Sequence, residues 1–427
     1  MNVTIEKLVY GGDGLAREAG DTIFVPYVLP GESVRIGVAQ KRKKFVRGSV
    51  EEILAPSSDR VSAPCRHFGI CGGCNYQHMP YAAQLRYKTE ILRETLARIA
   101  KIEWPGEIAV HASPEPLHYR NRAQWAVRRL GDPPRPQIGY FQQASSVLVP
   151  ATMCPISSPR LETALGKFRD ALSQGHLRWP IRAIEAFTDE RDEKLLLNVT
   201  VSKLKGSAKA LAEDIDAILP DVETMLVLTE EEGPLELFGP GFITYRAAGH
   251  AFRVGNLSFF QVNRFIIDDL VRGVTEGAKG ELALDLFSGV GLFSLPLARN
   301  FARVISVEGN VAATRDLEEN LKPAPNARAR RADVESFLER WRDKPDLVVL
   351  DPPRAGVDAD ALERLRALGP KSIRYLSCDP ATLARDLAVL TKPSGTGSPF
   401  SIRAITLYDI FPQTYHIEAL VTLERLD

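Results

Sequence analysis

The stretch "ELALDLFSGVGLFSLPLARN", residues 281–300, decides the fold, because a buried-strand pattern runs through a glycine turn directly into a helical pattern. Three further strand–helix pairs follow: "RVISVE" then "VAATRDLEENL", "DLVVLD" then "DADALERLRAL", and "SIRYLSC" then "PATLARDLAVL". Strands that alternate with helices are typical of a doubly wound parallel sheet. Two β-rich runs end the sequence as a hairpin, which makes the last strand antiparallel. Residues 256–427 are therefore predicted to form an α/β domain.

Two other parts precede this domain. Residues 1–54 contain short β-rich runs separated by the turn signals "GGDG" and "PGE", and are predicted to form a small OB-like β-barrel. The run "KRKKFVR" (41–47) has five basic residues around Phe45, which suits either a solvated edge hairpin or a face for a nucleic-acid backbone. Residues 55–255 mix β runs with one clear helix near 160–174, and are predicted to form an α+β central domain.

The bulk composition limits the class of protein. Lys plus Arg and Asp plus Glu each number 54 in 427 residues, so a surface that is basic throughout is excluded, whereas local basic patches are not. The N-terminus has no signal-peptide pattern, and no apolar run approaches the roughly 18 residues of a membrane span. Five cysteines in such a chain indicate a cytoplasmic protein that uses them for metal binding or catalysis. Nothing in the sequence indicates an obligate oligomer, so a monomer is expected.

The glycine turn of the α/β domain indicates a nucleotide-like ligand. Gly289 and Gly291 let the backbone approach a ligand closely. Glu308 ends the next strand about 20 residues on, where an acid binds ribose hydroxyls in dinucleotide folds. Asp351, in "DPPR", ends the following strand. The turn lacks the G-x-G-x-x-G spacing and begins with Asp285, so the cationic S-adenosylmethionine fits it better than NAD.

Cys378 ends the next strand, "SIRYLSC", and is therefore expected on the same rim of the sheet. Amines and hydroxyls attack a methyl donor with their own lone pair, whereas C5 of a pyrimidine has none. A thiolate that adds to C6 activates C5, and a general base must then remove the C5 hydrogen. The segment "FPQTYHIEAL" supplies two candidate bases, His416 and Glu418, between which the chemistry alone does not decide.

Five motifs in this order, "FFQVN" (259–263), "DLFSGVG", "DPPR", "SCDP" and "FPQTYHIE", resemble the RNA uracil-C5 methyltransferases, which make 5-methyluridine. The resemblance covers the whole chain, and the N-terminal barrel resembles a TRAM domain, an RNA-binding module. It implies a class I methyltransferase fold with Cys378 as nucleophile and Glu418, rather than His416, as base. It also implies cofactor contacts from Gln261, Phe287, Glu308 and Asp351, with Asp333 on the adenine side.

Two positions depart from the family's usual pattern. Leu292 follows the second glycine of the turn, where the family often has Asn, so one polar contact to the cofactor is lost. Asp379 replaces the Asn of "SCNP" and puts a negative charge next to Cys378, which opposes thiolate formation. Neither change removes a reacting group.

The other four cysteines are Cys65, Cys71, Cys74 and Cys154. Four thiolates suit a [4Fe–4S] cluster or a zinc site, and for zinc His67 or His78 could supply nitrogen ligands instead. The C-x5-C-x2-C spacing, with a distant fourth Cys followed by Pro, resembles the iron–sulfur branch of the family. That resemblance implies a [4Fe–4S] cluster with a structural role.

These observations predict S-adenosylmethionine-dependent methylation of C5 of a uridine in RNA. The TRAM-plus-cluster architecture resembles the members that act on 23S rRNA, with a tRNA T-loop uridine as the alternative. An exocyclic-amine N-methyltransferase using the "DPPR" turn would not need Cys378. A non-enzymatic RNA-binding cluster protein would not bind S-adenosylmethionine.

Overall fold

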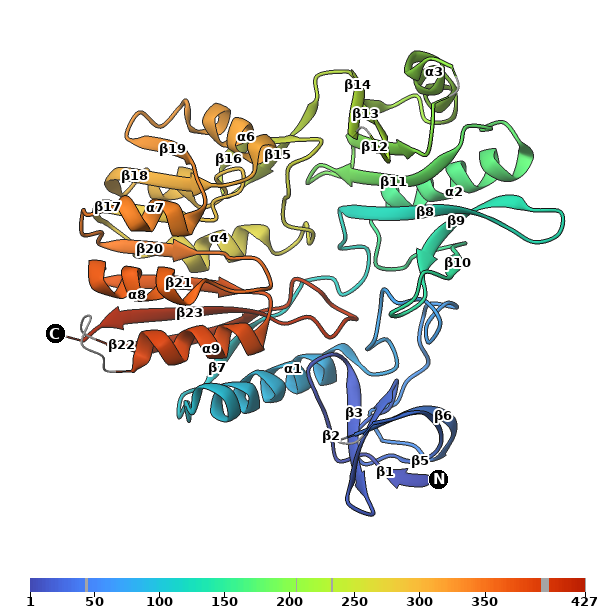
Figure 1. Ribbon diagram of the computed structural model, residues 1–427, viewed down its shortest axis with the longest axis horizontal. Helices are drawn as coiled ribbons and strands as arrows, with labels where there is room; N and C mark the ends of the chain where they lie inside the picture. Colours follow the sequence, from blue (N-terminus) through green and yellow to red (C-terminus); the bar gives the residue numbers. More distant parts are fainter. Residues whose placement is uncertain (43–44, 205, 232, 393–398, 427) are drawn as a thin grey trace.

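The protein consists of a curled N-terminal sheet, a central α+β part and a larger α/β part, shown from blue to red in Figure 1. The structure is a computed structural model that describes residues 1–42, 45–204, 206–231, 233–392 and 399–426. Lys43 and Lys44 of the basic run therefore lie outside the described residues. Among the helices of the described residues, none has the length and apolar character needed to cross a membrane.

The N-terminal sheet has six strands in the order β1-β5-β6-β4-β3-β2. The strands are β1 (Asn2–Thr4), β2 (Lys7–Leu8), β3 (Asp13–Glu18), β4 (Asp21–Pro26), β5 (Ser33–Lys41) and β6 (Val46–Ala55). β4 and β6 pair in parallel, whereas the other neighbours are antiparallel. The sheet encloses a small core that includes Val3, Ile23 and Val25, which agrees with the β structure predicted from the sequence.

The central part is a seven-stranded sheet in the order β10-β9-β8-β11-β12-β13-β14 with two helices. The elements are β8 (Arg122–Leu130), β9 (Arg135–Phe141), β10 (Leu148–Pro150), α2 (Pro159–Gln174), β11 (Ile181–Thr188), β12 (Leu195–Val201), α3 (Ala208–Ile218), β13 (Val222–Thr229) and β14 (Gly233–Phe238). The predicted helix near 160–174 is confirmed: the Ser158 side chain accepts a hydrogen bond from the Leu161 N–H, and Gly175 ends the helix in a left-handed conformation. Apolar side chains of both helices pack on this sheet, among them Phe168 and Leu211.

The α/β part contains an eight-stranded sheet in the order β19-β18-β17-β20-β21-β23-β22-β7. Its strands are β7 (Ile108–His111), β17 (Gly280–Leu286), β18 (Phe301–Glu308), β19 (Ala327–Arg331), β20 (Leu347–Leu350), β21 (Ser372–Ser377), β22 (Phe400–Tyr408) and β23 (Glu418–Arg425). A hairpin of β15 (Phe242–Ala247) and β16 (His250–Gly255) leads into it. β17 to β21 are parallel and β23 is antiparallel, which confirms the predicted topology.

Helices cover both faces of this sheet, as the doubly wound arrangement requires. One face packs against α7 (Val334–Arg340), α8 (Ala359–Leu368) and α9 (Pro380–Thr391). The other face packs against α4 (Ile267–Thr275), α5 (Ser294–Leu297) and α6 (Val311–Leu321). The carboxyl ends of the parallel strands, where open α/β sheets bind their ligands, lie between these two layers.

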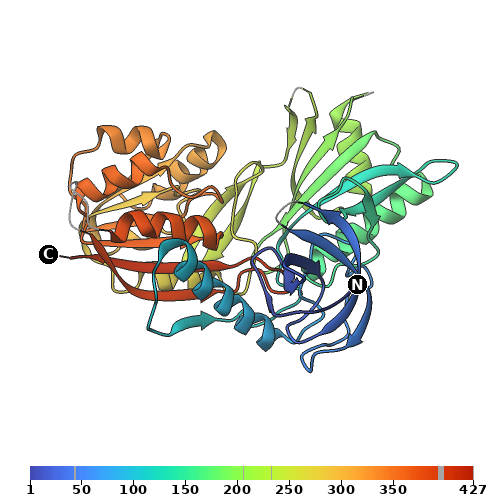
Figure 2. The same cartoon turned by 60° about the horizontal axis from the view of Figure 1, so that its bottom comes forward.

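One strand and two helical segments from the part of the chain predicted as central pack with the α/β part. β7 pairs in parallel with β22 and is itself the edge strand of the sheet. Helix α1 (Tyr81–Thr95) and the π-helical turn η1 (Leu96–Ala100) bury Ile91, Leu92 and Leu96 in the same core as α9. Figure 2 shows α1 running from the α/β part toward the N-terminal sheet. The chain therefore contributes α1, η1 and β7 to the α/β part before it forms the central sheet.

Candidate active site

Three neighbouring parallel strands bring predicted cofactor residues to one edge of the sheet. β17 is paired with β18 and with β20 as far as Leu286. The residues at the carboxyl ends of these strands are Phe287, Glu308 and Asp351, so their side chains lie near one another. Phe287 has a φ of 62°, a left-handed conformation that costs a non-glycine residue free energy and that clusters at functional sites.

The strand register also brings the predicted nucleophile and base together. β21 and β23 are antiparallel, and Ser377 is paired with Ala419. Cys378 and Glu418 are the next residues of the two segments beyond this pair, and the Glu418 carboxylate is close enough to raise the pKa of Cys378. The two side chains are separated by 39 intervening residues in the sequence but come from directly adjacent strand ends.

A cavity of about 760 Å³ opens at this edge. It is lined by every predicted catalytic and cofactor residue of the α/β part, namely Gln261, Phe287, Glu308, Asp333, Asp351, Cys378, His416 and Glu418. This volume lies in the usual range for cofactor sites. Phe259 and Arg354 also line it, and the sequence analysis assigned neither of them a role. Phe259 is 60% exposed, and so open an aromatic side chain at a cavity is a signal for ligand binding. That signal depends on the burial of the side chain, which the sequence does not give.

Electrostatics of the cavity disfavour further negative charge. Burial, followed by the carboxylates of Glu418 and Asp351, raises the pKa of Cys378 to about 12, whereas the Arg354 guanidinium acts in the opposite direction. Burial and then Asp351 raise the pKa of Glu418 well above its usual range. Burial and then Arg354 lower the pKa of His416 to about 3. So many acidic groups in one buried site favour a ligand that carries positive charge.

Glu308 is held by the backbone around it and keeps capacity for a ligand. Its carboxylate accepts hydrogen bonds from the N–H groups of Gly289 (2.8 Å) and Asn310 (2.7 Å). A carboxylate has about four acceptor positions, so two remain for hydroxyl groups such as those of a ribose.

The glycine turn itself requires glycine at position 291. A Cβ there would lie 2.8 Å from a methyl group of Leu317, and the φ of Gly291 is 92°.

Asp285 does not face the ligand, contrary to the expectation from the sequence. It is fully buried, and the cavity lining does not include it. Its carboxylate instead accepts a hydrogen bond from the Ser294 hydroxyl, at the start of α5, which has only four residues. Its charge still reaches the cavity, because after burial it is the main cause that raises the pKa of Asp351 to about 7.

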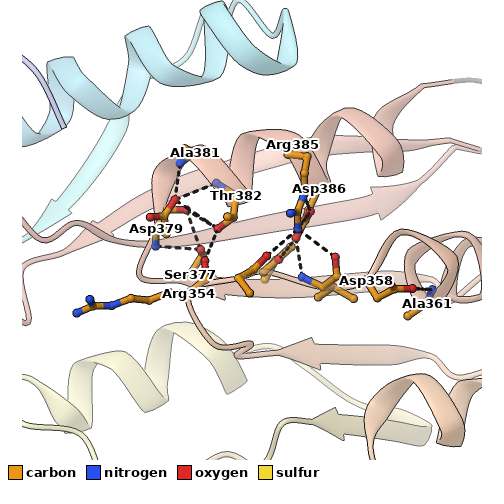
Figure 3. A network of polar contacts seen from close by, with 12 residues as sticks. Arg354, Asp358, Ala361, Ser377, Asp379, Ala381, Thr382, Arg385 and Asp386 are labelled. Atoms are coloured by element: carbon orange, nitrogen blue, oxygen red, sulfur yellow. Dashed lines mark hydrogen bonds and ion pairs between the residues drawn. The ribbon is translucent and has the colours of Figure 1, made fainter. Parts of the chain in front are cut away.

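A hydrogen-bond network fixes the "DPPR" turn against α9 (Figure 3). The buried carboxylate of Asp386 accepts hydrogen bonds from the Val357 N–H (2.9 Å) and the Tyr375 hydroxyl (2.5 Å). The Thr382 hydroxyl donates to the carbonyl oxygen of Arg354 at 3.2 Å. The Arg354 side chain extends away from this network (Figure 3), and it lines the catalytic cavity. The network therefore holds the backbone that presents Asp351 and Arg354.

The two departures from the family pattern have visible consequences. Asp379 caps α9: its Oδ1 accepts hydrogen bonds from the N–H groups of Ala381 and Thr382, both at 2.9 Å. Its charge also contributes, after burial and the other carboxylates, to the raised pKa of Cys378. Leu292 is 6% exposed and lines the cavity as an apolar side chain.

The four remaining cysteines line a separate cavity of about 180 Å³. They come from the loop at 65–74 and from the segment before α2. Burial raises the pKa of Cys65, Cys71 and Cys74, and repulsion by Cys154 adds to each of these shifts. A Cβ at Gly72 would lie 2.9 Å from backbone atoms of Gln143, so the loop packs tightly on the turn after β9.

The predicted zinc ligands are less well placed. His67 lines this cavity, and its Nε2 lies 3.2 Å from the Thr152 hydroxyl. The lining does not include His78, whose Nε2 lies 3.4 Å from the carbonyl oxygen of Val28. Within the part of the chain that the structure describes, no group of three or more His, Cys, Asp or Glu side chains is arranged to hold a metal ion. The four ligands of a cluster bind four separate iron atoms, so they stand farther apart than the ligands of one ion.

Comparisons with known proteins identify the family of the chain. Residues 80–426 match the family described as "tRNA (Uracil-5-)-methyltransferase", and residues 1–50 match the TRAM domain. An RNA methyltransferase of Gloeobacter violaceus is 32% identical, covering 100% of this chain and 96% of that protein. The 23S rRNA (uracil(1939)-C(5))-methyltransferase of Shewanella baltica is 31% identical, covering 99% and 95%. The solved structure of the Pyrococcus abyssi tRNA (uracil-54, C5)-methyltransferase with S-adenosyl-L-homocysteine has a TM-score of 0.78, 26% identity, and coverage of 99% and 100%.

Proposed function

The chain belongs to the tRNA (uracil-5-)-methyltransferase family and is an S-adenosylmethionine-dependent RNA uracil-C5 methyltransferase; from this premise we propose that Cys378 is its nucleophile and Glu418 its general base. The observation that carries the proposal is the pairing of β21 with β23, which brings Cys378 and Glu418 together at the rim of one cavity. The low pKa of His416, about 3, supports Glu418 over His416, because so weakly basic an imidazole is a poor proton acceptor.

The roles follow from what C5 methylation requires. The thiolate of Cys378 forms a bond to C6 of uracil, and the electron pair of the C5–C6 double bond moves to C5 and its conjugated carbonyl. When bound, S-adenosylmethionine supplies the methyl group that C5 takes up. The carboxylate of Glu418 then removes the C5 proton, the double bond forms again, and the Cys378 thiolate leaves. The uracil must leave its stack to reach Cys378, at a cost of a few kcal/mol.

The cavity contains suitable groups for the cofactor. We assign Glu308 to the ribose hydroxyls, because its carboxylate keeps free acceptor positions. Gln261, Phe287 and Asp351 are assigned to the rest of the cofactor, with Asp333 on the adenine side. The acidic groups around Cys378 are consistent with a sulfonium ligand.

Trapping tests the two catalytic roles. RNA that contains 5-fluorouridine has no C5 proton to remove, so wild-type protein and cofactor should give a methylated covalent complex that survives denaturing gels. Glu418→Gln should accumulate the same kind of complex on ordinary RNA, and Cys378→Ala should form none. His416→Asn is the matched control and should turn over. An active Cys378→Ala variant would instead indicate methylation of a lone-pair acceptor such as an exocyclic amine.

We propose a uridine of 23S ribosomal RNA as the substrate, with a tRNA uridine as the alternative. The Shewanella baltica relative, named for 23S rRNA, supports the first over the whole chain. The Pyrococcus abyssi structure, named for tRNA, supports the second. Transcribed 23S rRNA and tRNA, each methylated with a labelled donor and digested to nucleosides, should yield labelled 5-methyluridine from the ribosomal RNA. Label only in the tRNA would reverse the assignment.

We also propose that Cys65, Cys71, Cys74 and Cys154 hold a [4Fe–4S] cluster. Their gathering around one cavity supports this, as does the match between four thiolates and four iron atoms. The cluster would bind the loop to the central part. Anaerobically purified protein should contain about four iron and four sulfide per chain and lose its visible absorption in Cys154→Ser. Cys378→Ser, outside this cavity, is the matched control and should keep the absorption.

The proposed division of labour follows the three parts of the chain. Residues 1–54 bind RNA, residues 55–255 carry the cluster and shape the RNA, and residues 256–427 transfer the methyl group. Because nothing in the sequence indicates an obligate oligomer, we expect a monomer to be active. A ribosomal or transfer RNA substrate leads us to expect action in the cytoplasm.

A further inference from the structure

A second large cavity, of about 810 Å³, lies where the N-terminal sheet meets the cysteine loop and the turn after β9. Six aromatic rings line it, and each is half-buried: Tyr10, Phe24, Phe45, Tyr140, Phe141 and Tyr415. We call it the aromatic cavity. None of the catalytic or cofactor residues proposed above lines it, so it needs a separate explanation.

The rings of the aromatic cavity leave surface for a planar ligand. Phe24 and Phe45 meet edge-on, with centroids 5.9 Å apart, and Tyr10 and Tyr415 meet edge-on at 5.6 Å. An edge-on pair covers a face of only one of its two rings. Stacking on such rings stabilises single-stranded nucleic acid by about 1–3 kcal/mol per base.

Among the described residues, the lining also includes two charged groups, Asp13 and Arg47. Asp13 has a side chain 15% exposed, and its carboxylate lies 3.8 Å from a guanidinium nitrogen of Arg47, at the limit of an ion pair. The Arg47 side chain is 58% exposed, so it can reach a phosphate at the mouth of the cavity. A carboxylate accepts hydrogen bonds from the exocyclic amine of cytosine, adenine or guanine, which uracil lacks.

The aromatic cavity is a neighbour of the catalytic cavity. The Tyr10 hydroxyl donates to the carbonyl oxygen of Cys378 at 3.3 Å. Tyr415 is followed by His416, which lines the catalytic cavity. A single wall, made of Tyr10 and the segment before β23, therefore separates the two sites, and one strand of RNA can occupy both.

We propose that the aromatic cavity binds a second unstacked base of the substrate RNA, one with an exocyclic amine, while the target uridine occupies the catalytic cavity. The rings stack on this base, Asp13 accepts its amine and Arg47 holds its phosphate. This inference rests on the proposed function and deepens it, because it states what the enzyme reads beside the target.

Two variants and one control test the specificity. Single-stranded RNAs with a central 5-fluorouridine and randomised flanks are incubated with enzyme and cofactor, and the covalently held RNA is sequenced. Wild type should enrich an amine-bearing base at one flanking position. Asp13→Leu, which keeps bulk but removes the acceptor, and Phe45→Ala should each reduce that enrichment about tenfold. Arg35→Ala, on the same sheet with its guanidinium paired to Glu52 at the surface, is the control and should keep it.

A binding measurement separates this proposal from the proposed function. The adenine analogue 2-aminopurine, whose fluorescence is quenched by stacking, is placed at each flanking position of an RNA bound without cofactor. One position should be quenched by wild type and brighter with Phe45→Ala at equal occupancy. If the wild-type protein trapped no RNA covalently, the proposed catalytic roles would be refuted. The fluorescence measurement would still test the second-base site, because it needs neither cofactor nor a covalent bond. Equal enrichment and equal fluorescence in wild type, Asp13→Leu and Phe45→Ala would overturn the second-base site.

Discussion

Replacing Lys88 by Met tests how the catalytic segment is held. The Lys88 ammonium, on α1, lies 2.6 Å from a carboxylate oxygen of Asp409, and it also donates to the carbonyl oxygen of Phe411 at 2.9 Å. The side chains of the ion pair are 0% and 1% exposed. Asp409 directly follows β22, and Phe411 lines the catalytic cavity. The pair therefore joins α1 to the segment that leads to the proposed base.

The size of the effect follows from burial. Lys88→Met leaves the Asp409 carboxylate buried without its cationic partner, which costs about 3–5 kcal/mol. The chain offers a matched control, because Lys7 and Glu94 are also 2.6 Å apart but are 40% and 44% exposed. For Lys7→Met the expected cost is about 0–1 kcal/mol. The double variant Lys88→Met with Asp409→Leu should recover most of the loss, since it removes the unpaired charge.

Hydrogen exchange measures this locally, which suits a chain with several parts that need not unfold together. Amide exchange in α1 and in residues 409–417 should accelerate about a hundredfold or more in Lys88→Met, and hardly change in Lys7→Met. Equal exchange rates in the two single variants would contradict the cost expected for an unpaired, buried Asp409 carboxylate. Faster exchange in the double variant than in Lys88→Met would contradict it too.

Three further outcomes are expected. With RNA saturating and S-adenosylmethionine well below its KM, the methylation rate should rise from about pH 7 to pH 9, because the pKa of Cys378, about 12 without a bound cation, keeps its thiolate scarce near neutrality; a flat profile would contradict this. Asp351→Asn removes a charge that raises the pKa of both Cys378 and Glu418, so the rise should move to lower pH, and an alkaline shift would refute the coupling. In Gly72→Ala the new Cβ would lie 2.9 Å from backbone atoms of Gln143, so thermal melts should show a loss of stability of about 1–3 kcal/mol. In Gly73→Ala the nearest atom to the new Cβ is 3.6 Å away, so this variant should melt like the wild type.

The fold and the rim of the active site were predictable because the decisive pattern is local. Each strand–helix pair is written in about 20 consecutive residues, and the carboxyl ends of parallel strands meet at one edge whatever the loops do. Glu308, Asp351 and Cys378 could therefore be placed together from their positions at strand ends. Their pairwise order then followed from the strand register that the structure supplies.

What the sequence missed depends on contacts between distant segments. A lysine on an amphipathic helix is normally solvated, and the partner that buries Lys88 lies 321 residues away. The same holds for β7, a four-residue strand whose place at the edge of the α/β sheet depends on β22. The expectation that Asp285 faces the cofactor was wrong for a different reason. A carboxylate at the end of a strand can point into the protein, and here the Ser294 hydroxyl donates a hydrogen bond to it.

The acidic groups of the catalytic cavity link the ionisation of Cys378 to the binding of the cofactor. Asp351 and Glu418 each raise the pKa of Cys378, and burial prevents water from screening them. A positive charge brought into the same cavity lowers that pKa, and by reciprocity the thiolate strengthens the binding of the cation. We therefore propose that Cys378 stays a neutral, weakly reactive thiol until a sulfonium is beside it. On this proposal, the carboxylates that oppose ionisation of Cys378 confine its activation to the state in which a methyl group is available.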